Sequence, residues 1–166
     1  SLMRALAGIR SFARFLERIE PLSRALGGDQ ALAPHDAADA MAAALVHDVG
    51  HGPLSHLFEE VFATMPAHEA WTSAIVLDPD TMLHRVLATL DPEMPARVER
   101  LVHGDHRVRY LARAVSGTFD VDRCDYLLRD SYMTGTRYGL YDLDWLLRSL
   151  LLDPDPSGPR LAVDGS

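Results

Sequence analysis

The sequence HDVGHGPLSH, residues 47–56, holds three histidines, one aspartate, two glycines and a proline. It follows the Ala-rich segment 37–44, which is apolar nearly all round towards its end and is therefore expected to form a central, closely packed helix. Gly50 and Gly52-Pro53 should end that helix just after His47 and Asp48. The stretch therefore predicts a helix end that carries polar side chains into a turn.

Apolar spacing on both sides of this stretch predicts more helices. Residues 2–19 place an apolar side chain at every third or fourth position, and that helix should end before Pro21. Pro34 should open the Ala-rich helix. Residues 131–139 are expected to form a shaped loop. The other predicted elements are helices from about residue 53 to 61 and at 68–77, 82–90 with Thr81 as N-cap, 98–102, 107–115, 120–130 and 143–151, and a short strand at 160–163. The predicted fold class is all-α.

Length, composition and charge narrow the classes of protein. The 166 residues suit one domain, residues 1–166, and the 48% hydrophobic content is typical of soluble globular chains. No window approaches the roughly 20 apolar residues of a membrane helix, and the start lacks a signal-peptide pattern. The single Cys124 excludes an internal disulfide and suits a reducing compartment, so the cytoplasm is expected. A net charge of −8 disfavours general nucleic-acid binding but permits a phosphate ligand beside a metal ion.

His47 and Asp48 are candidate metal ligands. Neighbouring side chains diverge in mid-helix, but both can turn towards one ion where the helix unwinds at Gly50. Imidazole nitrogen with carboxylate oxygen suits Mn, Fe, Zn or, with more oxygens, Mg. A third ligand has to come from elsewhere, and the candidates are Asp120, Asp122 and Asp125.

His51, His56, Glu59 and His68 are candidate acid/base residues. Glu59 follows His56 by three positions, so the two share a helix face, and a carboxylate beside a histidine raises the pKa of the imidazole towards neutrality. The alternative is a polar helix junction in which the histidines cap backbone carbonyls.

The segment 119–130 is the second stretch with chemical content. On a helix, Asp122, Tyr126 and Asp130 lie on one face, and Arg123 lies one step round. The arginine could reach a phosphate, and the tyrosine and Asp130 could contact a sugar. The alternative is a solvated helix with Asp–Arg pairs, each worth a few tenths of a kcal/mol.

Together, the two stretches resemble the HD-domain phosphohydrolases, in particular the deoxynucleoside triphosphate triphosphohydrolases (dNTPases). The matching pattern is HDxGHGPxSHxFE at 47–59, His68-Glu69, and DVDRxDYxxRD at 120–130. The resemblance implies an HD-domain helical bundle, here as part of a larger, mostly helical protein. It also implies a homo-oligomeric full-length protein that hydrolyses dNTPs to deoxynucleoside and triphosphate.

The resemblance also assigns residues. It implies that His47, Asp48 and Asp122 hold a divalent metal ion such as Mn, Mg, Fe or Zn. The implied catalytic residues are His51, His56, Glu59 and His68, and the implied substrate-binding residues are Arg123, Tyr126 and Asp130.

One position departs from the family pattern. The family's first metal-binding histidine is expected directly before Ser1, and family members continue well beyond Ser166, so a longer parent protein is expected. Two alternatives stay open. One is an HD-type phosphomonoesterase or phosphodiesterase acting on another nucleotide, and the other is a catalytically inactive domain for nucleotide binding or oligomerisation.

Overall fold

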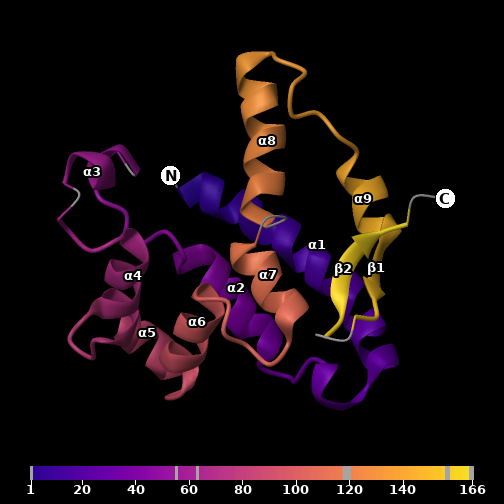
Figure 1. Ribbon diagram of the computed structural model, residues 1–166, viewed down its shortest axis with the longest axis horizontal. Helices are drawn as coiled ribbons and strands as arrows, with labels where there is room; N and C mark the ends of the chain where they lie inside the picture. The colour runs from indigo at the N-terminus through magenta and orange to yellow at the C-terminus, as the bar shows by residue number, and fades with distance from the viewer. Residues whose placement is uncertain (1, 55, 63, 118–120, 156–157, 165–166) are drawn as a thin grey trace.

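The computed structural model describes residues 2–54, 56–62, 64–117, 121–155 and 158–164, with side chains omitted for 2–9 and 121–122. Within these ranges nearly all of the regular secondary structure is helical, which confirms the all-α prediction (Figure 1). None of the described helices is long and apolar enough to cross a membrane. The elements are α1 (Leu2–Leu26), the 3₁₀ helix η1 (Gly28–Gln30), α2 (Asp36–Val46), α3 (His56–Val61), α4 (His68–Leu77), α5 (Met82–Leu90), α6 (Met94–Val102), α7 (Arg109–Ser116), α8 (Val121–Thr134), α9 (Leu143–Ser149), β1 (Leu150–Asp153) and β2 (Arg160–Val163).

Helix α2 is the centre of the bundle. It packs against α1, α6 and α7, while α4 and α5 pack on α6 (Figure 1). Ala40 and Ala43 are fully buried, and their small side chains allow neighbouring helices to come close. The buried side chains around them include Phe12, Ile19, Val98, Leu101, Tyr110 and Leu111.

The two aspartates in the first turns of α2 are buried in ion pairs. Asp39 is 1% exposed and accepts from Arg97 at 2.5 and 3.2 Å, and Arg97 also donates to Asp91 at 3.0 Å. Asp36 is fully buried and pairs with Arg107. These bonds join α2 to α6 and to the segment before α7, so the helix that leads to residues 47–56 is held firmly.

The predicted strand at 160–163 is confirmed, and it pairs with a second strand. β1 and β2 form an antiparallel hairpin in which Leu150 lies opposite Val163 and Asp153 lies opposite Arg160. The segment 150–153 was expected partly as helix. It leaves α9 as a strand, and Leu150 is buried against the core.

Besides the end of α9, three predicted helix bounds were wrong. Helix α6 begins at Met94 rather than at residue 98, and two other helices run past their predicted ends. Helix α1 continues through Pro21 to Leu26, because Ile19 before the proline and Ser23 after it are both buried on the core side. Helix α8 continues past Asp130 to Thr134, where Ser131 is buried and its hydroxyl accepts from the amide of Gly139 at 2.8 Å. In both cases packing outweighs the local signal.

Candidate active site

The turn after α2 is held against α4 by close backbone packing. A Cβ on Gly50 would lie 2.2 Å from the carbonyl oxygen of His68 and 2.4 Å from the amide nitrogen of Thr72, so only glycine fits there. The buried Thr72 hydroxyl accepts from the Gly50 amide at 3.0 Å and donates to the His47 carbonyl at 3.1 Å. These contacts bring residues 47–51 beside the first turn of α4.

His47 and Asp48 converge at the end of α2. Nε2 of His47 lies 3.3 Å from Oδ1 of Asp48, as expected for two ligands of one ion. Nδ1 of His47 is 2.9 Å from the carbonyl oxygen of Ala44. Because a carbonyl only accepts, Nδ1 carries the proton and Nε2 keeps its lone pair for a ligand.

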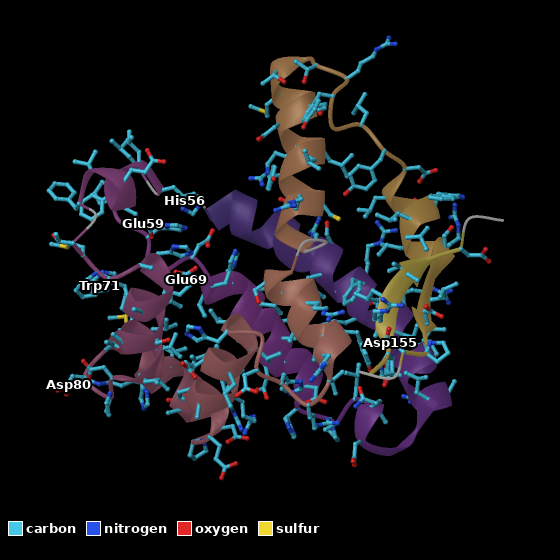
Figure 2. All side chains as sticks on the ribbon, viewed as in Figure 1. His56, Glu59, Glu69, Trp71, Asp80 and Asp155 are labelled. Atoms are coloured by element: carbon cyan, nitrogen blue, oxygen red, sulfur yellow. The ribbon has the colours of Figure 1, made fainter. Side chains whose placement is uncertain are left out.

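Three histidines surround the Glu59 carboxylate. The Nδ1 atoms of His68, His56 and His51 lie 2.7, 3.5 and 4.0 Å from its nearest oxygens. The rings of His51 and His68 stack with centroids 3.7 Å apart, and His56 meets both edge-on. One donor atom from each of these four residues lies within 4.8 Å of the others. We call these residues the His51 cluster; Figure 2 shows His56 and Glu59 close together on α3, beside α4.

His51 lies between the His47–Asp48 pair and Glu59. Its Nε2 is 3.6 Å from Oδ1 of Asp48, and its Nδ1 faces Glu59. That Nδ1 is buried and has no hydrogen-bond partner among the described residues. A buried nitrogen without a hydrogen-bond partner costs free energy unless a ligand or an ion binds to it.

The protonation states follow from these surroundings. Burial and the neighbouring His68 lower the pKa of His51 below 6.5, although Asp48 opposes this. The His68 amide, which donates to Glu59 at 2.8 Å, holds the pKa of the Glu59 carboxyl below 4.5 against partial burial. At neutral pH the cluster therefore contains a neutral His51 beside an ionised carboxylate.

A cavity of about 210 Å³ adjoins the cluster. Its walls are largely apolar, and Glu59 and His68 supply carboxylate and imidazole groups at its edge. A Cβ on Gly52 would approach the Phe58 ring to 2.8 Å, so glycine lets the turn run close to this wall. The cavity is lined by Gly50, Gly52, Phe58, Glu59, Met65, Pro66, His68 and Trp71.

The predicted substrate residues lie on α8. Arg123 lines a second, apolar cavity of about 280 Å³ between α8 and α9, together with Tyr141 and Trp145. Tyr126 and Asp130 are exposed, and within the described residues neither bonds to the His51 cluster. Asp125, a candidate third ligand, instead pairs with Arg129 at 2.8 Å.

The other two candidates for the third metal ligand are Asp120 and Asp122. The Asp122 side chain and the whole of Asp120 lie outside the described residues. The assignment of Asp122 to the metal therefore stays a prediction.

Sequence reasoning missed Thr72. Its role depends on α4 packing against the turn after α2, which no local pattern encodes. The one available signal was its spacing of four residues from His68, which puts both side chains on one face of α4.

Comparison with known proteins identifies the family. The model of the HD domain matches residues 11–130. The chain belongs to the HD-domain family. Relatives of this chain include the uncharacterized protein YwfO of Bacillus subtilis, which is 42% identical over 108 residues that cover 65% of this chain and 24% of YwfO. Protein MJ1154 of Methanocaldococcus jannaschii, also uncharacterized, is 36% identical over 107 residues covering 64% of this chain and 20% of that protein. The chain thus spans about a quarter of the length of the curated relatives it matches.

Solved structures share the fold of this HD domain. A phosphohydrolase from Bacteroides thetaiotaomicron superposes with a TM-score of 0.72 at 24% identity, covering 97% of this chain and 36% of that one. A hypothetical protein from Aquifex aeolicus gives a TM-score of 0.73 at 26% identity, covering 98% and 40%.

The HD-domain residues present fit a divalent metal ion. Nε2 of His47 carries its lone pair and lies beside the half-exposed Asp48 carboxylate, so nitrogen and oxygen donors meet at a solvent-accessible point. Such a mixed donor pair suits Mn, Fe or Zn.

Proposed function

We propose that this HD domain belongs to a metal-dependent phosphohydrolase whose substrates are dNTPs, cleaved to deoxynucleoside and inorganic triphosphate. The observation that carries the proposal is the position of His51 between Asp48 and Glu59. This position supports a division in which the His47–Asp48 pair on one side of the ring would bind metal and the residues on the other side, which adjoin the cavity, would act as acid and base.

The metal half would comprise His47, Asp48 and Asp122. A divalent ion held there would polarise the phosphate and lower the pKa of a bound water. The Ala44 carbonyl keeps His47 in the tautomer that this requires.

The His51 cluster would supply the proton that the leaving group takes up. His56 is 73% exposed, so a leaving group can reach it, and the Glu59 carboxylate 3.5 Å from its Nδ1 orients the ring. His56 would protonate the 5′ oxygen of the leaving deoxynucleoside. His51 and His68 would stabilise charge that develops on the phosphate.

The choice of dNTPs as substrates rests on the resemblance of 47–59, 68–69 and 120–130 to the dNTPases. In this proposal Arg123 neutralises phosphate charge, while Tyr126 and Asp130 hold the sugar. An acidic protein can bind such an anion when a metal ion and an arginine supply local positive charge.

The test is product analysis. The protein is incubated with each dNTP and with Mn²⁺, Mg²⁺, Fe²⁺ or Zn²⁺, and phosphate products are separated by ion-exchange chromatography. Inorganic triphosphate with free deoxynucleoside supports the proposal. Orthophosphate or pyrophosphate instead indicates a different HD-type phosphohydrolase.

A His56→Ala variant separates catalysis from binding alone. The proposal predicts that it binds nucleotide but loses turnover. If the wild type is stabilised against heat by nucleotides without turnover, and His56→Ala behaves identically, the domain is an inactive nucleotide binder and the proposal fails.

A further inference from the structure

The donor atoms around Glu59 have a composition unlike that of the His47–Asp48 pair. Three imidazoles direct Nδ1 towards one carboxylate, whereas the first pair offers one imidazole and one carboxylate. Nitrogen-rich sets of this kind favour Zn²⁺ and neighbouring transition metals over Mg²⁺, which prefers oxygen ligands.

The spacing of these atoms is close to that of a coordination shell. Zn–N and Zn–O bonds of about 2.0–2.2 Å put the donors of a tetrahedral site about 3.3–3.6 Å apart. Glu59 oxygens lie 2.7, 3.5 and 4.0 Å from the three Nδ1 atoms, and all four donors lie within 4.8 Å of one another. Small side-chain rotations would bring these donor atoms to bonding distance of one ion.

Three of the four residues have surroundings that suit metal binding. Glu59 is fixed by the His68 amide at 2.8 Å. His51 presents a buried Nδ1 that no described residue satisfies. His56 is 73% exposed and free to adjust, so an ion can enter from solvent.

We infer that the His51 cluster is a second metal site, distinct from the His47–Asp48 pair, that takes a transition-metal ion of the Zn²⁺ class through His51, His56, Glu59 and His68. An ion there would occupy the lone pairs that proton transfer needs. Zn²⁺ should therefore inhibit hydrolysis supported by Mn²⁺, a consequence that rests on the proposed function.

Direct binding of Zn²⁺ tests the site without substrate. Metal-stripped protein is titrated with Zn²⁺ by calorimetry, and the bound metal is counted after equilibrium dialysis by elemental analysis. The wild type and Asp48→Asn should each bind one equivalent of Zn²⁺ at the His51 cluster. The double variant Glu59→Gln/His68→Gln should bind this equivalent about tenfold more weakly or worse. Since no turnover is involved, failure of the proposed hydrolysis leaves this result intact.

Three comparisons make the test specific. Glu99→Gln/His103→Gln removes another His/Glu pair, with Nε2 and Oε1 3.5 Å apart, and should leave Zn²⁺ binding unchanged. The single variants Glu59→Gln and His68→Gln, checked for helix content by circular dichroism, show whether loss follows the ligands or a loss of fold. Excess Mg²⁺ should not displace the ion.

Two results would overturn the inference. One is equal Zn²⁺ affinity in the wild type and in folded Glu59→Gln/His68→Gln. The other is loss of all Zn²⁺ binding in Asp48→Asn, which would assign the ion to the first pair.

Discussion

The carboxylates of Asp48 and Glu59 approach opposite nitrogens of one imidazole, that of His51. Nε2 lies 3.6 Å from Asp48, and Nδ1 lies 4.0 Å from Glu59. The His51 ring thus connects the His47–Asp48 pair, proposed to bind metal, to the Glu59 carboxylate of the proposed acid/base cluster. Substitutions in the His47–Asp48 pair and in the His51 cluster should therefore have different effects on metal binding and on turnover.

Replacing His51 should affect turnover more than binding of the first metal ion. Because His51 is not one of the proposed ligands of the first ion and its Nδ1 faces Glu59, His51→Gln should lower kcat by about 10²–10⁴-fold while Mn²⁺ affinity changes little. Steady-state kinetics and Mn²⁺ titration on the same preparation measure both quantities. His103→Gln, which removes an exposed histidine outside the cluster, should retain full activity; a comparable loss there would argue against a specific role of His51.

Gly50→Ala should disturb the site through the backbone. The new methyl group would overlap the His68 carbonyl and the Thr72 amide, and neither backbone atom can move without shifting α4. We expect a loss of about 1–3 kcal/mol in the free energy of unfolding, with weaker metal binding. Urea denaturation measures the first.

Gly52→Ala provides the internal comparison. The atoms nearest to its methyl group would all belong to the Phe58 ring, a side chain that can rotate. This variant should be less destabilised than Gly50→Ala. The reverse order would contradict the packing described for the turn.

Thr72→Val should weaken the link between the turn and α4. Valine keeps the volume but leaves the Gly50 amide and the His47 carbonyl without the hydroxyl that bonds to both. The expected cost is about 1–3 kcal/mol in unfolding free energy. Thr72→Ser, which keeps the hydroxyl, should lie much closer to the wild type; equal losses in the two variants would point to packing rather than to these hydrogen bonds.

The buried Asp36 should make stability depend on acid pH. Burial disfavours its ionised form, but His106, the Ala33 amide and Arg107 outweigh burial and hold the pKa of Asp36 below 3.8. A lowered carboxyl pKa contributes stability that is fully present well above pH 3.8 and is lost as the pH falls through the folded-state value.

Asp36→Asn tests this. The variant should lose about 1–3 kcal/mol at neutral pH, because the charged bond from Arg107 to Asp36 is lost while Arg107 keeps its bonds to the carbonyls of Asp29 and Ala31. Its difference from the wild type should shrink in acid. Urea unfolding from pH 7 to pH 3 measures the gap. As a control, Asp144→Asn removes an exposed ion pair with Arg14 and should change stability little. If the stability difference between Asp36→Asn and the wild type does not change with pH, ionisation of Asp36 does not contribute to stability.

Local signals predicted much of the fold and part of the site. Helices α4 and α5 begin and end where apolar spacing placed them, and Thr81 caps α5 by accepting from the His84 amide. The pairing of His56 with Glu59 follows from helical spacing. What the sequence did not reveal depends on tertiary packing: the burial of Asp36, the continuation of α1 through Pro21, and the contact of Gly50 with α4.

The central claim is that the residues from His47 to Glu59 form a metal-dependent phosphohydrolase site. The most direct measurement is the rate of triphosphate release from a dNTP as Mn²⁺ is added back to metal-stripped protein. We expect no release without metal, a saturable rise in the wild type, and almost no rise in Asp48→Asn. Release that needs no metal, or an equal rise in Asp48→Asn, would contradict this claim.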